Sequence, residues 1–456
     1  MLFDTIAAIS TPIGEGAIGI VRLSGPESFG IVDKIFKANV DKLDWEDRKL
    51  KYGHIYDGDH LIDEVMIVKM YAPRTYTRED IVEINCHGGA VPLREILRIC
   101  LREGARLAER GEFTKRAFLN GRIDLAQAES IMDLINSKTN KGFDIAINQL
   151  EGHLSNKINM IRSELIKIMA EVEVSIDYPE EDIEEITYDA LGSGLENAAL
   201  QIQNLLKSSN TGKIIREGLK TVIIGKPNVG KSSLMNVLLK DSRAIVTDIP
   251  GTTRDVIEEF LSVDGIPIKL VDTAGIRETE DLVERLGVEK SKSYFNAADL
   301  VIFMLNGAEP LSPEDHMLME KVKDKPAIVL INKSDLEQKI ELESISDIFS
   351  NEQIIMTSMS NESGIQQLED EIKRLVFGIQ IDQGNQEIVS NTRHIALLEI
   401  ALKHINEALN ATKQSLPYDF IEVDVKEAIV QLGLVTGESV ASDLMQTIFS
   451  QFCLGK

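Results

Sequence analysis

The sequence is poor in cysteine and contains no long apolar run. Only three of the 456 residues are cysteines, and Cys86, Cys100 and Cys453 match neither a zinc-binding spacing nor a disulfide framework. No apolar stretch approaches the length that spans a bilayer, and the first residues, MLFDTIAAIS, have no basic stretch before their apolar ones. We therefore expect a protein of the reducing cytoplasm, with no membrane partner.

Positive charge is also scarce. Lysine and arginine number 49 against 74 aspartates and glutamates, which gives a net charge of −25. Only residues 1–118 are close to charge balance, and the remainder carries almost all of the excess. Because an acidic surface repels a phosphate backbone, tight binding of nucleic acid by this chain alone is disfavoured, although a local basic patch could still act.

One stretch carries a complete nucleotide-binding pattern. The residues LKTVIIGKPNVGKSSLMN begin with an apolar run typical of a buried strand and continue into a glycine-rich loop and an amphipathic segment. Gly225 and Gly230 enclose four residues and are followed by Lys231 and Ser232, which is the G-x-x-x-x-G-K-[ST] pattern. In such a loop the backbone surrounds phosphates, the lysine reaches the β- and γ-phosphates, and the serine binds Mg²⁺. The alternative is a glycine turn before an ordinary helix, but the preceding apolar run favours the phosphate site.

Three later motifs indicate that the bound nucleotide is a guanine nucleotide. DTAG, at 272–275, follows an apolar run and provides an acid for Mg²⁺ and a glycine N–H for the γ-phosphate. NKSD, at 332–335, follows another such run, and its aspartate can accept N1–H and the exocyclic amine of guanine, a donor pair that adenine lacks. SMS, at 358–360, stands where a loop usually closes over the base and departs from the commoner Ser-Ala-Lys. Together the four motifs predict a P-loop GTPase.

The rest of the chain changes character near residues 119 and 379. Residues 1–118 carry short strand-like runs, intervening glycines and a helix-like stretch, which predicts an α+β domain. In 119–212 and 379–456 apolar residues recur at steps of three and four, the spacing of an amphipathic helix. Neither apolar stripe can be buried alone, so we expect the two segments to pack together around an inserted GTPase at 213–378. Two separate helical regions are the alternative.

Motifs outside the GTPase are similar to those of one family over the whole chain. They are DTIAA (4–8), GEGAIGIVRLSG (14–25), YTRED (76–80), HGG (87–89), the run 111–129 and the final FCLGK. They resemble the MnmE family, also called TrmE, of tRNA-modification GTPases. The resemblance implies a multidomain protein: an α+β folate-binding and dimerisation domain (1–118), an α-helical domain in two parts (119–212 and 379–456) and an inserted α/β Ras-like GTPase domain (213–378).

The resemblance also implies a reaction and a partner. A homodimer would form a heterotetramer with the flavoprotein MnmG and build an aminomethyl or carboxymethylaminomethyl group on C5 of the wobble uridine of certain tRNAs. The one-carbon unit would come from 5,10-methylene- or 5-formyl-tetrahydrofolate, and FAD and NADH would act through the partner.

Each site maps onto residues of this chain through the same resemblance. GTP would contact Asn228, Val229, Gly230, Lys231, Ser232, Ser233, Thr247, Asp248, Ile249, Pro250, Gly251, Thr252, Thr253, Asp272, Thr273, Ala274, Gly275, Asn332, Lys333, Asp335, Ser358, Met359 and Ser360. Mg²⁺ would bind to Ser232 and Thr253, and K⁺ to Asn228, Thr247, Ile249 and Thr252. Tetrahydrofolate would bind to Arg22, Glu79, Arg122 and Lys456, for which surface ion pairs and a frayed terminus are the alternative. Cys453 matches a family cysteine, and a buried inert thiol is its alternative.

The GTPase motifs lack the glutamine that orients water in Ras-like proteins. Ile276 follows Gly275 at that position, and its side chain cannot orient water. The resemblance implies that K⁺ supplies the charge an arginine finger provides elsewhere and that Glu284 orients the water. Without the resemblance, Glu284 is an exposed helix acid. The alternative functions are a ribosome-assembly or RNA-binding GTPase without one-carbon chemistry, whose RNA module should be basic, and a scaffold whose GTPase only controls dimer shape.

Overall fold

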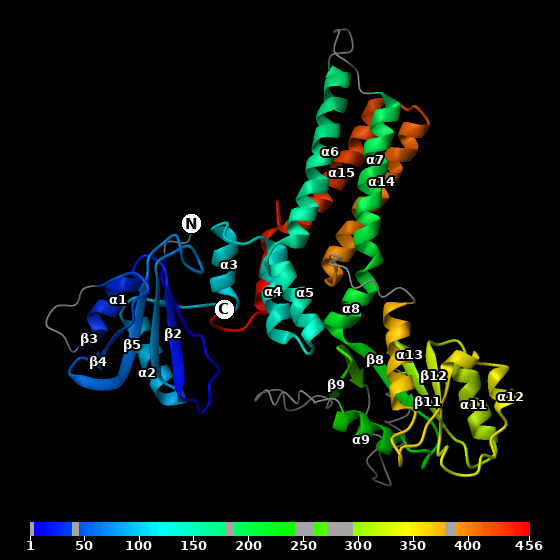
Figure 1. Cartoon of the computed structure of the whole chain (residues 1–456). Coiled ribbons are helices and arrows are strands. Elements are labelled where there is room, and N and C mark those ends of the chain that lie inside the picture. Colours follow the sequence, from blue (N-terminus) through cyan, green and yellow to red (C-terminus); the bar gives the residue numbers. More distant parts are fainter. Residues whose placement is uncertain (1–3, 39–44, 178–186, 242–258, 271–294, 379–387) are drawn as a thin grey trace. The chain divides into compact units, whose positions relative to one another are not determined.

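The computed structural model describes residues 4–38, 45–177, 187–241, 259–270, 295–378 and 388–456 (Figure 1). The chain separates into two compact units. The first comprises Met1–Met132, Gln149–Arg162 and Val430–Lys456, and the second comprises Asp133–Asn148 and Ser163–Ile429. Among the described residues, no helix combines the length and the apolar character needed to cross a membrane.

The first unit contains a seven-stranded sheet in the order β3-β4-β5-β6-β2-β1-β7. Neighbouring strands are antiparallel except β1 and β7, which are parallel. The strands are β1 (Ile6–Ile9), β2 (Ile18–Ser24), β3 (Phe36–Ala38), β4 (Lys51–Asp57), β5 (His60–Met70), β6 (Ile81–His87) and β7 (Arg106–Leu107).

Alternating side chains give this sheet two faces with different surroundings. Val21 and Leu23 of β2 are buried in a core that also contains residues of α1 (Ser28–Ile35) and α2 (Ala90–Arg102). Because successive side chains of a strand point to opposite faces, Arg22 lies on the face away from these two helices. This second face carries Arg22 in the middle of the sheet, and Phe113 covers it at β1.

The C-terminal residues complete the first unit. Phe449 and Phe452 pack with Ala117, Leu125 and Ile131 in one apolar cluster. This cluster joins α3 (Glu112–Leu119), the start of α4 (Leu125–Asn136) and α16 (Ser442–Ser450). The end of the chain is thereby held against residues 117–131.

The second unit contains a six-stranded sheet in the order β13-β12-β11-β8-β10-β9. All neighbours are parallel except β9 and β10. Every residue of β11 and β12 is buried, as expected for parallel strands covered on both faces. The strands are β8 (Leu219–Ile224), β9 (Glu259–Val263), β10 (Ile266–Leu270), β11 (Leu300–Asn306), β12 (Ala327–Asn332) and β13 (Ile354–Met356), and the helices are α9 (Lys231–Asp241), α11 (Pro313–Val322), α12 (Leu342–Ser346), η1 (Asn351–Gln353) and α13 (Ile365–Phe377).

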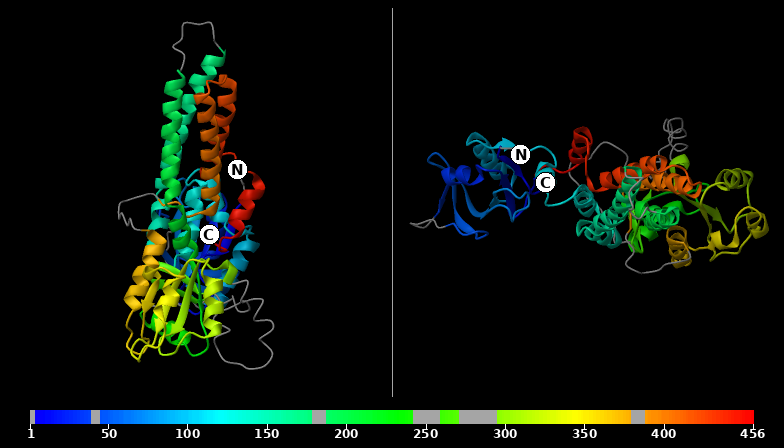
Figure 2. Two further views of the ribbon diagram at one scale, coloured as in Figure 1. Left: turned by 90° about the vertical axis from the view of Figure 1, so that its right-hand side faces the viewer. Right: turned by 90° about the horizontal axis from the view of Figure 1, so that it is seen from above.

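Long helices lie before and after this sheet in the sequence. They are α5 (Asn140–Leu150), α6 (His153–Asp177), α7 (Tyr188–Lys207), α8 (Ser209–Glu217), α14 (Thr392–Lys413) and α15 (Tyr418–Thr436). Helices α7 and α14 lie side by side in both figures and bury Leu195 and Ile202 on α7 and Leu398 and Ile405 on α14 (Figures 1 and 2). The two helical segments therefore pack together, and the predicted fold class is confirmed.

The chain leaves the helices for the second sheet and returns to them at neighbouring points. The backbone N–H of Val389 donates to the Ser208 hydroxyl at 3.3 Å, and the Thr392 hydroxyl donates to Glu217 at 3.2 Å. A Cβ on Gly212 would lie 2.4 Å from the carbonyl oxygen of Val389, so the two chain segments approach too closely there for a side chain. The outgoing and returning segments are thus packed against each other.

Candidate functional site

The glycine-rich loop joins β8 to α9, as its sequence predicts. Gly225 and Gly230 have φ values of +151° and +107°, a region that favours glycine. A Cβ on Gly225 would lie only 2.4 Å from the carbonyl oxygen of Met304 on β11. The loop therefore requires glycine both for its backbone conformation and for its close approach to the neighbouring strand.

Lys231, the first residue of α9, points back across this loop. Its Nζ donates to the carbonyl oxygens of Gly225 at 2.6 Å and Lys226 at 2.7 Å. Burial lowers the pKa of Lys231, while the charge of Glu314 acts in the opposite direction. Ser232 and Ser233 follow as exposed residues at the helix N-terminus. This places a cation, two hydroxyls and a helix N-terminus around one loop, the combination that binds phosphates.

Asn332, at the end of β12, links three of the predicted motifs. Its Nδ2 donates to the carbonyl oxygen of Val229 at 2.7 Å, and its Oδ1 accepts from the backbone N–H of Met359 at 3.2 Å. The phosphate loop, the NKSD motif and the SMS motif are therefore in direct contact, although they are distant in sequence. Lys333 follows with a positive φ of 65°.

Asp335 lies at the edge of the same site with its charge stabilised. The Ser358 hydroxyl donates to its carboxylate and is 2.8 Å from the Ser360 hydroxyl. The hydrogen bond from Ser358 is the main reason that the pKa of Asp335 lies below its usual range. An exposed, ionised carboxylate is the acceptor that a guanine edge requires. The departure from Ser-Ala-Lys thus adds the Ser360 hydroxyl beside the Ser358 hydroxyl that contacts this acceptor.

The other predicted GTPase positions lie outside the described residues. They are Thr247, Asp248, Ile249, Pro250, Gly251, Thr252, Thr253, Asp272, Thr273, Ala274, Gly275 and Glu284. Of the predicted K⁺ ligands, only Asn228 is described, and it has a positive φ of 64°.

A second group of predicted residues meets on the face of the first unit's sheet that lies away from α1 and α2. Arg22 pairs with Glu83 on β6, with 2.8 Å between Nε and Oε1. The guanidinium carbon of Arg22 lies 5.9 Å from the ring centre of Tyr76, and that of Arg122 lies 4.5 Å from the same centre. Two arginines far apart in sequence therefore share one aromatic ring.

The C-terminal tail reaches this same place. The Ser10 hydroxyl donates to the carbonyl oxygen of Gly455 at 3.1 Å, and an Arg22 nitrogen lies 3.4 Å from that oxygen. The backbone N–H of Gly111 donates to the carbonyl oxygen of Cys453 at 3.4 Å. Lys456 follows Gly455 directly and is partly buried. The tail is thus hydrogen-bonded to the domain that carries Arg22, rather than free.

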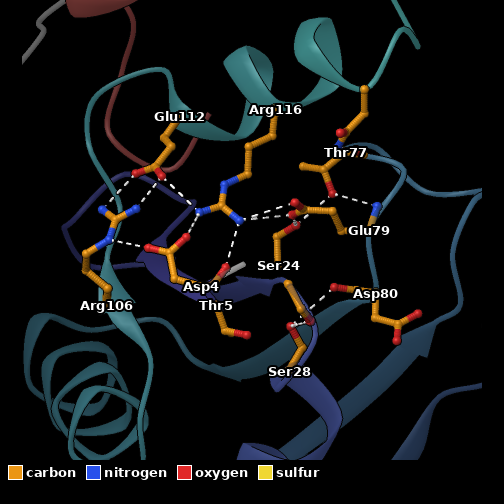
Figure 3. A network of polar contacts seen from close by, with 12 residues as sticks. Asp4, Thr5, Ser24, Ser28, Thr77, Glu79, Asp80, Arg106, Glu112 and Arg116 are labelled. Carbon is orange, nitrogen blue, oxygen red and sulfur yellow. Dashed lines mark hydrogen bonds and ion pairs between the residues drawn. The ribbon is translucent and has the colours of Figure 1, made fainter. Parts of the chain in front are cut away.

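Glu79 belongs to a network of charges around one buried arginine, which Figure 3 shows. At its centre lies Arg116 of α3, whose side chain is 1% exposed. Its guanidinium contacts the carboxylates of Asp4 at 2.8 Å, Glu112 at 3.0 Å and Glu79 at 3.2 Å. The Ser24 hydroxyl also donates to Glu79, at 2.7 Å. The Glu79 carboxylate is therefore held from two sides.

The charges of this network support one another. Burial opposes ionisation of Asp4 and Glu112, but hydrogen bonds from Arg106 and Arg116 outweigh it and keep the pKa of both carboxyls below their usual values. Removing one partner of a buried pair typically costs about 3–5 kcal/mol, because a charge is left without its counter-charge.

Sequence reasoning missed four residues of this region as site residues. They are Asp4, Tyr76, Glu112 and Arg116, all of which lie within the motifs DTIAA, YTRED and the run 111–129. Position in these motifs was the available signal, because polarity alone does not distinguish a buried charge from a surface one.

Both groups of residues lie in stretches that match known proteins. A family model described as GTP-binding protein TrmE N-terminus matches residues 5–122, and one described as MnmE helical domain matches residues 125–453. The chain is 52% identical to the tRNA modification GTPase MnmE of Alkaliphilus oremlandii, with 99% of each chain covered. It is also 52% identical to that of Bacillus subtilis, with 99% of this chain and 100% of the relative covered. The chain belongs to the MnmE family.

Membership of the MnmE family makes the chain a GTP-binding GTPase of tRNA modification, as the sequence motifs predicted. Among solved structures, Aquifex aeolicus Era is 26% identical over 40% of this chain and 65% of its own, with a TM-score of 0.27. That score is too low to support an argument about function.

Thiol labelling should distinguish the three cysteines of this MnmE family member. Cys86 and Cys100 are buried, whereas Cys453 is exposed, so the alternative of a buried thiol at Cys453 is wrong. Burial raises the pKa of Cys86 to about 11 and that of Cys100 to about 12, so almost no reactive thiolate forms there at pH 8. We expect a chromogenic disulfide reagent at pH 8 to label one thiol rapidly in the folded chain and all three after denaturation. Cys453→Ser should abolish the rapid phase, and a rapid phase in that variant would contradict this assignment.

Proposed function

We propose that this chain is a K⁺-dependent GTPase that modifies tRNA together with the flavoprotein MnmG. The pair installs a (carboxymethyl)aminomethyl group on C5 of wobble uridine, using a one-carbon unit from tetrahydrofolate. The observation that carries the proposal is the convergence of Arg22, Arg122, Tyr76 and the C-terminal tail on one sheet face. A GTPase that acted only as a switch would not require such a cationic, aromatic site beside a fixed carboxylate.

The chemistry of this site suits a reduced folate. A folate has a flat pterin with amino and N–H donors at one edge and a glutamyl tail that carries carboxylates. Glu79, held by Ser24 and Arg116, offers a carboxylate that can accept from the pterin edge. Arg22, Arg122 and Lys456 offer cations for the glutamyl carboxylates. The Tyr76 ring, which lies near both Arg22 and Arg122, provides an apolar face.

Two of the predicted ion ligands, Ser232 and Asn228, lie in or directly after the phosphate loop. We propose that Lys231 binds the phosphates, that Ser232 and Thr253 hold Mg²⁺, and that Asp335 selects guanine. Asn228, with Thr247, Ile249 and Thr252, would hold K⁺, which supplies positive charge to the transferring phosphoryl group. Glu284 would orient the attacking water, the role that Ile276 cannot perform.

The remaining chemistry belongs to the partner. The sequence contains no dinucleotide-binding fingerprint, so FAD and NADH would be bound by MnmG. With a net charge of −25, the chain is a poor solitary ligand for a polyanion, and MnmG should supply much of the basic surface that contacts tRNA. We propose a cytoplasmic heterotetramer in which two copies of this chain associate through residues 1–118, while residues 213–378 act as the GTP-driven gate.

Folate binding tests the first site. Arg22→Ala and Glu79→Ala should each weaken binding of 5-formyl-tetrahydrofolate by about tenfold or more, because each removes a charge-assisted hydrogen bond. Isothermal titration of the full chain measures this. Arg98→Ala is the matched control, since Arg98 pairs with Asp57 on the helix-covered side of the sheet. Wild-type affinity in both test variants would discard the assignment.

Cation dependence tests the second site. GTP hydrolysis by the full chain should be much faster in KCl than in NaCl at equal ionic strength. Glu284→Ala should keep its nucleotide affinity but lose about 100-fold in kcat, the range for groups that position a nucleophile. Glu343→Ala, at an exposed acid of α12, is the control. Equal rates in the two salts would refute the K⁺ site, and a loss of affinity without a loss of rate would make Glu284 a binding residue.

Reconstitution tests the division of labour. Purified chain, MnmG, tRNA, methylene-tetrahydrofolate, NADH, a nitrogen donor and GTP should together yield the modified wobble uridine, detected by mass spectrometry of nucleosides. The chain without MnmG should hydrolyse GTP but leave tRNA unmodified. Full modification without MnmG would overturn the shared reaction, and normal modification without GTP hydrolysis would overturn the gating role.

A further inference from the structure

Lys226, the second residue of the phosphate loop, is tied to a helix outside the predicted GTPase motifs. Its Nζ lies 2.6 Å from Oδ2 of Asp315 and 3.0 Å from the Ser312 hydroxyl, both at the N-terminus of α11. The side chains of Lys226 and Asp315 are only 16% and 3% exposed. The loop that surrounds the phosphates is therefore joined to α11 by a nearly buried ion pair.

Asp315 is itself fixed within α11. Its backbone N–H donates to the Ser312 hydroxyl at 3.3 Å, while its carboxylate accepts from the backbone N–H of Ser312 at 2.9 Å and from the hydroxyl at 2.8 Å. This is a capping box, with Pro313 at the first helical position. Burial opposes ionisation of Asp315, but the hydrogen bonds from Lys226 and Ser312 outweigh it and keep its pKa below the usual range. The carboxylate is thus charged and has little freedom to move.

Lys226 carries this restraint into the loop. Pro227 follows it and restricts its backbone to extended conformations. The carbonyl oxygen of Lys226 accepts from Nζ of Lys231, the lysine that binds phosphates. The far half of the loop is held separately, through the hydrogen bond from Asn332 to Val229. Two fixed points, one at each half, therefore define the shape of the loop.

We propose that Asp315 is a positioning residue for nucleotide binding, which acts by anchoring Lys226 and so ordering the first half of the phosphate loop. A loop that must be ordered during binding gives a lower affinity, because the cost of ordering is subtracted from the binding free energy. The role requires no contact between Asp315 and the nucleotide.

Two simpler roles for the Lys226–Asp315 ion pair predict different effects of its loss on nucleotide affinity. If the pair only stabilised α11, its loss would lower the unfolding temperature and leave nucleotide affinity unchanged. If Lys226 acted only through its positive charge, removing it would weaken binding, but Asp315→Asn would strengthen binding because an anion near the phosphates is lost. Positioning predicts that both substitutions weaken binding.

The test measures the Kd and dissociation rate of a fluorescent GDP analogue on the full chain, together with kcat at saturating GTP. Asp315→Asn keeps an oxygen that can accept from Ser312 while removing the charge that holds Lys226, and Lys226→Met removes the cation. Each should raise Kd about tenfold, within the range of couplings between contacting charged residues. Because the two act as one unit, the double variant should bind no more weakly than the weaker single variant. Once GTP saturates the site, kcat should stay within about twofold of wild type.

Lys373→Met is the matched control. Lys373 forms an ion pair with Asp264 elsewhere in the second unit, so its loss should not alter nucleotide affinity. Unchanged or tighter binding by Asp315→Asn would overturn the proposal, as would additive losses in the double variant. If Lys226→Met fails to fold because Asp315 is left without a counter-charge, Asp315→Asn decides alone, with its folding verified by circular dichroism.

Discussion

The buried guanidinium of Arg116 is the interaction on which the first unit depends. Three carboxylates from different parts of the chain surround it, and its loss would leave the buried Glu112 carboxylate short of a counter-charge. The same contacts join the residues just before β1, the loop between β5 and β6, and α3 at one point. The charge that holds these segments together also fixes Glu79, the carboxylate proposed for folate, so stability and binding geometry share one cause.

Secondary structure explains how distant residues reach that point. Strand alternation turns Arg22 away from α1 and α2, and the apolar cluster around Phe449 and Phe452 brings the end of the chain back to α3. Gly455 has a positive φ of 86°, and because it lacks a Cβ the tail can pass close to β1, where a Cβ would lie 2.3 Å from the Ile9 carbonyl oxygen. The tail is therefore a structural part of the site that Arg22 belongs to.

Some of this arrangement could be predicted from sequence, because it depends on local patterns. The glycine and lysine spacing located the phosphate loop, and the three-four periodicity of residues 379–456 indicated amphipathic helices, such as α14, which buries Leu398 and Ile405. The order of the seven strands could not be predicted, since it depends on pairings between segments with similar apolar alternation. Arg116 and Asp315 were missed for a related reason: a charged residue on a helix is usually solvated, and only its distant partners identify it as buried.

The contact between Ser208 and Val389 has a mechanical consequence. A domain joined to its host by one flexible segment can rotate freely about that segment and transmits little torque. Here the outgoing and returning segments touch, and the Thr392–Glu217 hydrogen bond adds a second link between them. A paired connection of this kind resists twisting, so a rotation of the inserted domain would be transmitted to α7 and α14 together.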